Sequence, residues 1–568
     1  MEKRIWRADV GRRIVTTETV RPEWERLGGR GLIARMLLDE VPPTCHPLGA
    51  YNKILWTPGL LAGYKISSCD RVSVGAKSPL TGGIKESNAG GTTGVALVRL
   101  GIHALVVEGQ PDGDDWWILR LGADGGSFER AGDLVGLGVY ETAQRLIARY
   151  GRTAAYAVIG PGGERRLSGA GVFNLDKDRE PSRANGRGGM GAVMGAKHLK
   201  AVVIEPGGGE MPSAEREEPF AAAKKDFLRE LMAHPQTKAY ADYGTAALVM
   251  MTDTFGGFPT RNFSAGHFEG AEKISGEALR DMLLARGKPS ETTHACMAGC
   301  VIRCSNIVAD EQGKKIVAPL EYETIALTGS NLGLDDLDII SRLNWEMNDI
   351  GLDTIDTGAA LGVAGEAGYL RFGDVDSIFA LIGEIRQGTP FGRILASGAA
   401  TTGRVLGVGR VPAVKGQAMA AYDPRAIKGT GVTYATSPQG ADHTAGLTIR
   451  AQVNHRDPAG QAELSHKIQI NNAGYDTLGA CLFAGFGFAK VPGTIPEMLK
   501  ACYGADMGED ALQQLGRETL RLEKAFNRAA GFGPAHDRIP HWMTKEPLPP
   551  TGSVFDVAEE DLDKAADW

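Results

Sequence analysis

Short apolar runs, separated by glycine- and proline-containing turns, fill the first 206 residues of the chain. Runs rich in β-branched and aromatic side chains and bounded by such turns are typical of β-strands. The segments that fit this description are 53–56, 72–74, 103–109, 116–121 and 201–205. Segment 138–150 has helical spacing of its apolar residues instead. This part of the chain is therefore predicted to be mainly β, with a few helices.

The pattern changes after residues 207–218, a polar segment that begins with three glycines and forms the clearest boundary in the chain. Beyond it, apolar residues recur at helical spacing. Helices are predicted at 220–233, 276–285, 334–347 and 512–527. A softer boundary falls near 407–417. We expect an α+β protein with a β-rich N-terminal domain (1–206) followed by two mainly helical domains, at 210–410 and 411–568.

Composition narrows the class of protein. A length of 568 residues suits two to four domains. The net charge of −7 argues against general nucleic-acid binding, which usually shows a basic patch. The 77 glycines are nearly twice the average share of about 7%, and they cluster, which indicates backbone lying close to ligands. We find no secretory signal and no apolar stretch near the roughly 18 residues of a membrane span, so a cytoplasmic protein is expected.

Three of the seven cysteines are evenly spaced, at Cys296, Cys300 and Cys304, and Cys481 is the best candidate for a fourth partner. Four thiolates are the ligands of a cubane [4Fe–4S] cluster. Zinc is an alternative, although structural zinc sites usually have tighter cysteine pairs. A radical enzyme would have C-x3-C-x2-C, and buried free cysteines at helical spacing are also possible. We favour a cluster beside a second redox centre. The isolated cysteines are interpreted as small buried apolar residues: Cys45, Cys69 and Cys502.

Two glycine-rich segments are candidate anion sites. Segment 186–191 matches G-x-G-x-x-G, but no convincing strand precedes it and no clear βαβ unit follows, so a dinucleotide fingerprint is rejected. The flanking Arg183 and Arg187 still favour phosphate binding, because guanidinium groups pair with phosphate oxygens. Segment 87–94 is either a turn after a strand or a backbone cradle for an anion.

Two further segments, 347–354 and 475–481, share the pattern Asx-x-x-Gly-(Leu/Ala)-(Asp/Cys). Coincidence in a glycine-rich chain is one explanation. The other is a pair of sites for two copies of a heterocycle, since a carboxylate accepts two hydrogen bonds from an N–H/NH2 edge.

Taken together, these segments resemble the tungsten-containing aldehyde ferredoxin oxidoreductase family along the whole chain. The blocks that carry the resemblance are 28–32, 58–63, 71–82, 186–195, 321–324 and 434–437, the last leading to His443. The resemblance implies a β-rich base with two helical domains over it. Between them it implies a tungsten or molybdenum held by the dithiolenes of two pyranopterins.

The resemblance also implies residue roles. Residues implied around the pterin phosphates are Arg71, Asn88, Gly90, Arg183, Ala184 and Gly186. Backbone carbonyls of Asn88 and Ala184 would hold a bridging Mg2+. One pterin would be served by Asn348, Leu352 and Asp353, and the other by Asp476 and Ala480. The [4Fe–4S] ligands would be Cys296, Cys300, Cys304 and Cys481.

The implied reaction is oxidation of an aldehyde to a carboxylic acid. Glu323 would act as general base toward water or the hydrate, and His443 would hydrogen-bond the substrate oxygen and relay a proton. No NAD or flavin unit is seen, so electrons are expected to pass to ferredoxin or a small iron–sulfur subunit. Alternatives are a reductase of the same fold acting on an activated aromatic acid or another substrate, a non-catalytic homologous subunit, or a simple iron–sulfur carrier.

The chain departs from the family pattern at several positions. The first cysteine spacing is x3 where the family commonly has x2. Asn348 replaces an expected Asp, and Ala480 replaces a usual Leu. Segment 342–345 lacks the E-x-x-H motif that carries an intersubunit metal in some members. An oligomer is still expected, but not one bridged by that metal.

Overall fold

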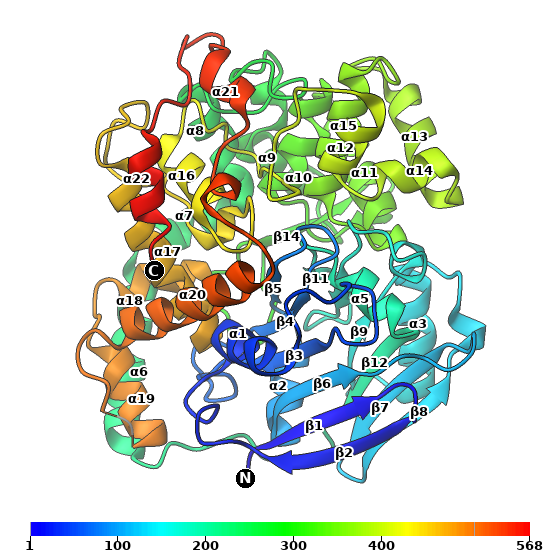
Figure 1. The fold of residues 1–568 in the computed structure, drawn as a ribbon, viewed down its shortest axis with the longest axis vertical. Coiled ribbons are helices and arrows are strands. Elements are labelled where there is room, and N and C mark those ends of the chain that lie inside the picture. Colours follow the sequence, from blue (N-terminus) through cyan, green and yellow to red (C-terminus); the bar gives the residue numbers. More distant parts are fainter. Residues whose placement is uncertain (1, 505) are drawn as a thin grey trace.

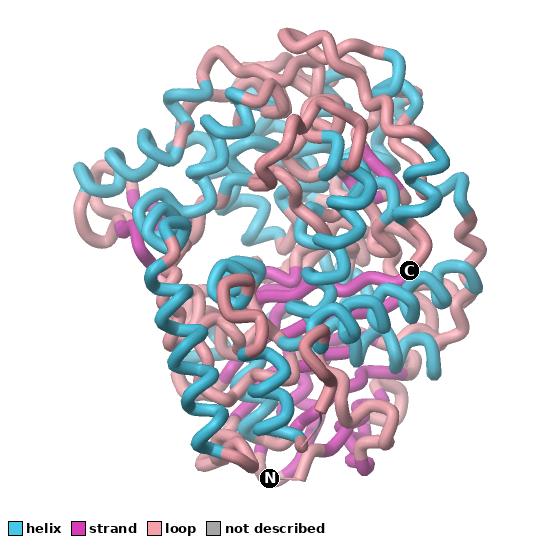
Figure 2. Tube along the Cα trace, turned by 90° about the vertical axis from the view of Figure 1, so that its left-hand side faces the viewer, coloured by secondary structure: helices cyan, strands magenta, loops and turns pink. Residues whose placement is uncertain are grey.

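The structure, a computed structural model, describes residues 2–504 and 506–568. A β-rich N-terminal region lies below a mainly helical remainder (Figure 1). In the view turned by 90°, the strands again gather in the lower half with helices above them (Figure 2). The change from strands to helices, predicted after residue 206, is confirmed: the last strand of the large sheets is β12 (Leu199–Glu205) and the next helix is α6 (Glu217–Ala233).

Two six-stranded mixed sheets form the N-terminal region. The first has the order β2-β1-β6-β3-β4-β5 and consists of β1 (Arg4–Asp9), β2 (Ile14–Thr19), β3 (Ile54–Pro58), β4 (Val72–Lys77), β5 (Ile84–Ala89) and β6 (Ile102–Glu108). The second has the order β11-β10-β9-β12-β7-β8, and its other strands are β7 (Trp117–Gly122), β8 (Gly125–Arg130), β9 (Ala155–Val158), β10 (Val172–Asn174) and β11 (Arg183–Asn185). The five predicted strands correspond to β3, β4, β6, β7 and β12.

Helices of this region pack on the sheets. They are α1 (Gly29–Glu40), α2 (Thr93–Arg99), α3 (Val139–Tyr150), α4 (Pro161–Glu164) and α5 (Met190–Ala196). The predicted helix at 138–150 is α3.

One detail of the sequence analysis was wrong. A strand, β11, directly precedes Gly186, and helix α5 follows the glycines. The strand was missed because it is only three residues long and polar; the side-chain amide of its Asn185 donates to the carbonyl of Ser87 over 2.6 Å. Yet β11 pairs antiparallel with β10, and β10, β9 and β12 are joined by antiparallel pairs. No parallel βαβ unit is made here, so rejecting the dinucleotide site was sound.

The remainder is mainly helical. Its helices after α6 are α7 (Pro235–Tyr243), α8 (Leu248–Thr254), α9 (Gly276–Arg286), α10 (Tyr322–Thr328), α11 (Leu337–Ile350), α12 (Thr354–Glu366), α13 (Val375–Gln387), α14 (Pro390–Leu395), α15 (Ala399–Leu406), α16 (Lys428–Thr436), α17 (Gln461–Leu478), α18 (Gly485–Phe488), α19 (Thr494–Tyr503), α20 (Ala511–Ala529), α21 (His541–Lys545) and α22 (Glu559–Ala565). The four helices predicted beyond residue 210 correspond to α6, α9, α11 and α20. Short strands are β13 (Glu291–His294), β14 (Ser305–Ala309), β15 (Lys315–Val317), β16 (Ala413–Val414) and β17 (Gln417–Ala418).

A buried ion-pair cluster joins the two regions. Arg30 of α1 is 1% exposed, and its Nε and Nη2 donate to the carboxylate of Glu523 of α20 over 2.8 Å each. Its Nη1 donates to Asp476 Oδ2 of α17 over 3.2 Å. A guanidinium group fully removed from water needs such partners, because an unpaired buried charge is very costly. The cluster therefore fixes α1, α17 and α20 together behind the sheet.

Replacing Arg30 with methionine should reduce the free energy of unfolding by about 3–5 kcal/mol, because the carboxylate of Glu523 is left buried without its partner. Chemical denaturation followed by circular dichroism measures this. The matched control is Arg35→Met in the same helix: Arg35 is 30% exposed and pairs with Asp39 four residues on. Arg35→Met should lower the free energy of unfolding by less than about 1 kcal/mol, because the ion pair is partly exposed to water. Equal losses in both variants would contradict the assignment.

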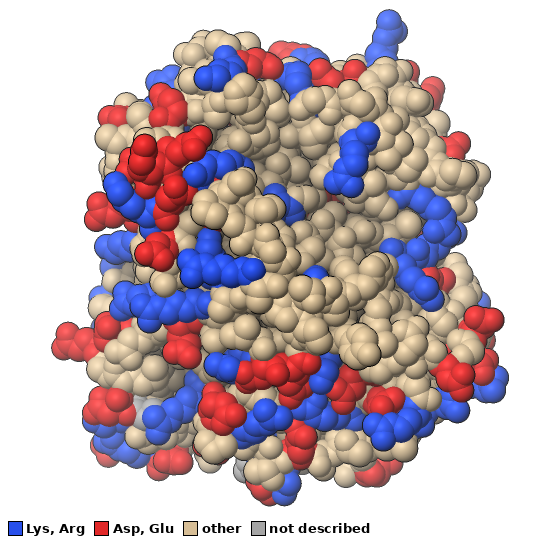
Figure 3. All heavy atoms as spheres, in the orientation of Figure 1, with Lys and Arg blue, Asp and Glu red and all other residues tan. Residues whose placement is uncertain are grey.

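The described residues include no helix both long and apolar enough to span a bilayer. On the face drawn in Figure 3, acidic and basic side chains are interspersed, in keeping with the small net charge of −7.

Candidate active site

A cavity of about 300 Å3 brings together segments far apart in the chain. All four predicted cluster cysteines line it. Eight of the predicted cofactor residues line it too: Arg71, Gly90, Arg183, Ala184, Gly186, Asn348, Leu352 and Asp353. Three others, Asn88, Asp476 and Ala480, do not line this cavity, and neither do Glu323 and His443.

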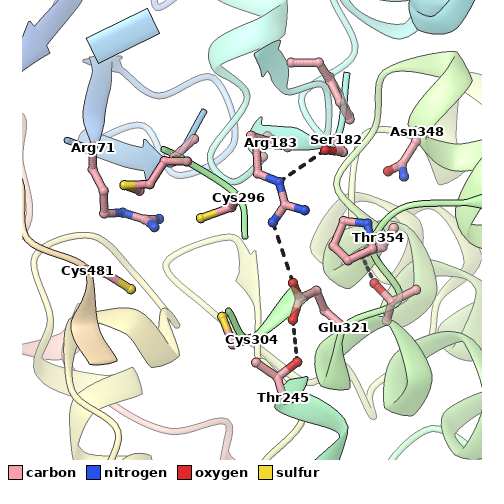
Figure 4. A pocket seen from close by; sticks show the side chains of 18 of the residues that line it. Arg71, Ser182, Arg183, Thr245, Cys296, Cys304, Glu321, Asn348, Thr354 and Cys481 are labelled. Atoms are coloured by element: carbon pink, nitrogen blue, oxygen red, sulfur yellow. Dashed lines mark hydrogen bonds and ion pairs between the residues drawn. The ribbon is translucent and has the colours of Figure 1, made fainter. Parts of the chain in front are cut away.

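The cysteines come from two places. Cys296, Cys300 and Cys304 lie on the loop between β13 and β14, and Cys481 follows the C-terminal end of α17. Ser68 contacts both segments: its hydroxyl lies 3.2 Å from Cys300 Sγ, and its carbonyl accepts from the Cys481 N–H over 2.7 Å. Figure 4 shows Cys296, Cys304 and Cys481 around one space beside Arg71. The longer first spacing thus still leaves the three loop cysteines on the same cavity.

The spacing of the sulfurs bears on the kind of metal centre. No three of the cysteine sulfurs, all of which belong to the described part of the chain, lie within 4.8 Å of one another. Four thiolates on a single zinc, with Zn–S bonds of about 2.3 Å, would be no more than ~4.6 Å apart. The four cysteines instead line one cavity, which has room for a group larger than a single ion. Burial raises the pKa of the Cys304 and Cys481 thiols, so a positive centre is needed to hold them as thiolates.

The arginines lie where the sequence analysis expected an anion. Arg71 donates from Nη2 to the carbonyl of Asn88 over 3.0 Å and also contacts the Asn88 side chain. Arg183 donates to Ser305 Oγ over 2.7 Å and lies 3.9 Å from Glu321 Oε1. Figure 4 shows Arg183 between the cysteine side of the cavity and the side carrying Asn348. Positive charge is therefore available beside the cysteines, from Arg71, and between the two sides of the cavity, from Arg183.

Arg187 was interpreted as one of two arginines that bind phosphate at segment 186–191, but its charge is paired with carboxylates of the protein. Its side chain is buried, and its charge is used inside the protein: Nε lies 3.3 Å from Asp353 Oδ2 and Nη2 lies 3.4 Å from Asp356 Oδ2. It also donates to the carbonyl of Ala441 over 2.8 Å. Arg187 thus connects the first loop with the segment that carries His443.

The two similar loops share a backbone structure. Each ends a helix, α11 or α17, with a left-handed glycine: φ is 86° at Gly351 and 75° at Gly479. In each, the N–H of the residue after the glycine bonds back five positions, from Leu352 to the carbonyl of Met347 and from Ala480 to that of Tyr475, over 2.9 Å in both cases. This is the Schellman cap, which needs glycine at this point. The shared pattern is therefore a helix end that presents an Asx side chain and free backbone groups.

The two pterin residues predicted in the second loop do not line the cavity, although Cys481 at the end of that loop does. Asp476 accepts from the side-chain amide of Asn88 over 3.0 Å and from Arg30. Ala480 is fully buried. Because Asn88 also contacts Arg71, a chain of hydrogen bonds connects the second loop to the cavity.

Glu323 and His443 face each other in the interior. Glu323 is on the first turn of α10, flanked by the cavity-lining Glu321 and Thr324. Its Oε2 accepts from the Ala421 N–H over 2.8 Å, and its Oε1 lies 3.4 Å from His443 Nε2 with no hydrogen-bond partner in the described chain. A buried carboxylate oxygen without a partner is rare in protein cores, so Oε1 of Glu323 is available to accept a hydrogen bond.

Behind His443, Asp442 is buried against the ammonium of Lys85. Burial acts to raise the pKa of Asp442, but the charges of Lys85 and Arg187 hold it well below its usual range. A fixed negative charge therefore lies 3.7 Å from His443 Nδ1. The sequence offered no signal for this pair, because its members are 357 residues apart.

A buried carboxyl at Glu86 was also not anticipated. Its Oε1 lacks a hydrogen-bond partner among the described residues, and burial together with the neighbouring Asp476 raises its pKa to about 8. The folded protein therefore holds a proton that the unfolded chain releases above a pKa of about 4.3. Stability from this proton is complete at low pH and is lost as the pH rises through about 8.

Replacing Glu86 with glutamine should therefore flatten the pH dependence of stability. Between about pH 5 and pH 8, the melting temperature of the parent protein should fall more steeply than that of Glu86→Gln. The exposed Glu217→Gln should keep the parent slope. Parallel curves for all three proteins would contradict the raised pKa.

Glu321, Ser68 and Thr245 line the cavity but received no role from the sequence. Glu321 belongs to a block that carried the resemblance, so a signal existed. Ser68 gave none, since its cysteine partner is 232 residues away.

The comparisons with known proteins identify the class. Residues 5–206 match the family model for the N-terminal domain of aldehyde ferredoxin oxidoreductase, and residues 222–567 match the model for its domains 2 and 3. The chain therefore belongs to the aldehyde ferredoxin oxidoreductase family, a family of tungsten- and pterin-dependent oxidoreductases.

Comparisons with individual proteins add detail to this family assignment. The chain is 33% identical over 560 residues to the tungsten-containing aldehyde ferredoxin oxidoreductase of Thermococcus kodakarensis, covering 94% of this chain and 89% of the relative. It is 27% identical to the WOR-like subunit of an aliphatic sulfonate oxidoreductase of Pyrococcus furiosus, covering 92% and 85%. The BamBC active-site complex of benzoyl coenzyme A reductase, solved with 1,5-dienoyl-CoA, has the same fold: TM-score 0.81, 19% identity, coverage of 100% and 94%.

Proposed function

We propose that this chain is a tungsten or molybdenum bis-pyranopterin enzyme that oxidises an aldehyde to a carboxylic acid and passes the electrons through a [4Fe–4S] cluster. The observation that carries the proposal is the single cavity on which all four cysteines meet Arg71, Arg183 and the first helix-end loop. The family membership supports the pterin, and the 33% identity to an aldehyde oxidoreductase supports the substrate class.

The donor set fits these groups. Cys296, Cys300, Cys304 and Cys481 would ligate the cluster, each supplying a thiolate. Around the pterin phosphates we assign Arg71, Asn88, Gly90, Arg183, Ala184 and Gly186. Carbonyls of Asn88 and Ala184 would hold Mg2+; oxygen donors are what that ion prefers. Asn348, Leu352 and Asp353 would contact one pterin, and Asp476 and Ala480 the other.

Close packing also supports this assignment. A side chain added at Gly90 would begin 3.0 Å from Cys296 Sγ, so only glycine leaves the sulfur room for a cluster. Gly186 is less crowded, with Asp353 Oδ1 3.7 Å from that point. Backbone at both positions can therefore approach a bound phosphate closely.

The overall reaction is aldehyde plus water to carboxylic acid, two protons and two electrons. A bound metal–pterin centre supplies Lewis acidity and accepts the electrons. Oε1 of Glu323, which lacks a partner, accepts the proton from water or from the aldehyde hydrate. Nε2 of His443 donates a hydrogen bond to the substrate oxygen and passes a proton on. Asp442, which is paired with Lys85, lies 3.7 Å from Nδ1 of His443 on the side of the ring away from Glu323.

The remaining assignments are part of the same proposal. Electrons leave to ferredoxin or to a small iron–sulfur subunit, the chain works in the cytoplasm as part of an oligomer, and the helical remainder divides into two domains near residue 410. The WOR-like relative is itself named as a subunit, which supports a multi-subunit arrangement.

The test combines metal analysis of the purified protein with aldehyde-dependent reduction of a viologen dye. We expect tungsten or molybdenum together with about four iron atoms per chain, and dye reduction that depends on aldehyde. Iron without tungsten or molybdenum would overturn the metal–pterin assignment. Both metals without aldehyde activity would refute aldehyde oxidation and favour a reductase of the same fold.

A further inference from the structure

The loop that carries the first two cysteines has an exposed tip. Ala298 and Gly299 are exposed, whereas their neighbours Cys296 and Cys300 line the cavity. Gly299 has φ of 75°, and nothing lies within 4 Å of the point where a side chain would begin. Two small residues therefore form the outer wall of the cysteine site, and another protein can approach the sulfurs closely there.

Four cations lie on the loop itself or on segments that contact it. Arg99 and Arg179 line, with Met297 and Ala298, a cavity of about 160 Å3. Lys65 and Arg303 are exposed on two segments that meet, since the Ser67 hydroxyl accepts from the Val301 N–H over 3.1 Å. We call this set the cysteine-loop surface: Lys65, Arg99, Arg179, Ala298, Gly299 and Arg303.

None of the four cations of this surface forms an ion pair with any residue in 2–504 or 506–568, so carboxylates of the described chain do not neutralise them. Arg99 donates to the carbonyl of Gly207 over 2.8 Å, and Arg179 donates to that of Ala154 over 3.0 Å; both acceptors are neutral. The exposed acid nearby, Asp178, is paired with Lys177 and His294. A local excess of positive charge on a chain of net charge −7 is therefore concentrated over the cysteines.

We propose that the cysteine-loop surface is the docking site of an acidic iron–sulfur protein that takes electrons from this chain. Charge complementarity steers such a partner and orients it, while the small tip shortens the distance between the two clusters. One electron at a time passes from the reduced cluster of this chain to the oxidised cluster of the partner, and no bond is made or broken. The proposal rests on the proposed function for the cluster of this chain and for the origin of the electrons.

The test reverses charge on the exposed pair, with the double variant Lys65→Glu/Arg303→Glu. A purified acidic two-cluster ferredoxin serves as the probe. At low ionic strength, the Kd for the oxidised ferredoxin should rise about tenfold or more, and aldehyde-dependent kcat/KM for ferredoxin should fall by a similar factor. The rate with methyl viologen, a small cation, and the iron content should not change. Added salt should weaken binding by the parent protein far more than by the variant.

The matched control is Arg404→Glu/Lys545→Glu, which makes the same charge change at two other exposed positions. It should bind ferredoxin as the parent does; equal weakening in both double variants, or none in either, overturns the docking site. If the first double variant loses iron, Lys65→Glu alone, outside the cysteine loop, must still weaken binding. If the double variant binds ferredoxin more weakly but the parent protein does not oxidise aldehydes, the docking site is supported and the proposed function is refuted. If the parent oxidises aldehydes and the double variant binds ferredoxin as well as the parent does, the proposed function is supported and the docking site is refuted.

Discussion

Replacing Cys481 with serine is expected to abolish electron transfer to ferredoxin. The serine hydroxyl is a poor ligand for iron, and Cys481 is the one proposed cluster ligand outside the loop 296–304. Its backbone N–H donates to the carbonyl of Ser68 over 2.7 Å, and the Ser68 hydroxyl lies 3.2 Å from Cys300 Sγ, so this position is held beside the loop cysteines. We expect the iron content and the broad visible absorption of the cluster to fall together, with viologen- and ferredoxin-linked aldehyde oxidation lowered by at least about 100-fold.

The control for this experiment is Cys45→Ser. Cys45 is partly buried, like Cys481, but lies outside the cavity. It should keep full iron and full activity. A Cys481→Ser protein with undiminished iron would refute the assignment of the fourth ligand, whatever its activity.

The fold could be predicted where a segment keeps one spacing of apolar residues along its whole length. Each of the predicted strands and helices has a counterpart, because apolar periodicity reports directly on which face is buried. Segments that are short or polar were missed. β11 is the clearest example: its residues serve the contact between two sheets through Asn185, and this contact joins positions 98 residues apart.

The candidate site was predictable to a similar extent and for a similar reason. Spacing within one segment identified the cysteines, and composition identified the arginine–glycine clusters; the structure places most of them on one cavity. What spacing cannot reveal is a pairing between distant segments. Lys85 and Asp442, or Ser68 and Cys300, acquire their roles only when the chain folds.

The likeness of the two helix-end loops has a physical explanation that the sequence analysis had left open. Gly351 and Gly479 are required by the backbone, since each has a left-handed φ within a Schellman cap. Glycine therefore indicates a helix end in both loops. The Asx residues differ in position: Asn348 of the first loop lines the cavity, whereas Asp476 of the second is bound by Asn88 and Arg30 and is connected to the cavity through Asn88 and Arg71.

A left-handed glycine also occurs between the first two cysteines, in the Cys-x3-Cys segment. Gly299 takes a left-handed φ of 75° at the exposed tip, which turns the chain there. The cysteines on either side, Cys296 and Cys300, both line the cavity. The exposed Ala298 and Gly299 between them therefore shape the outer face of the loop, where the proposed partner docks.

Replacing Glu323 with glutamine should lower kcat for aldehyde oxidation by about 10²–10⁴-fold, because Oε1 of Glu323 is the only proposed acceptor for the proton of water or the hydrate. The amide keeps the shape of the side chain but cannot take up a proton. His443→Gln should have an effect of the same order, since it removes the donor that lies 3.4 Å from Glu323 Oε1. Both variants should retain tungsten, pterin and iron, because neither side chain lines the cavity that holds the proposed cofactor residues.

The exposed Glu311→Gln is the matched control and should leave kcat unchanged. Normal turnover in either site variant would refute its catalytic role, and loss of tungsten in Glu323→Gln would assign that residue to holding the cofactor instead of to proton transfer.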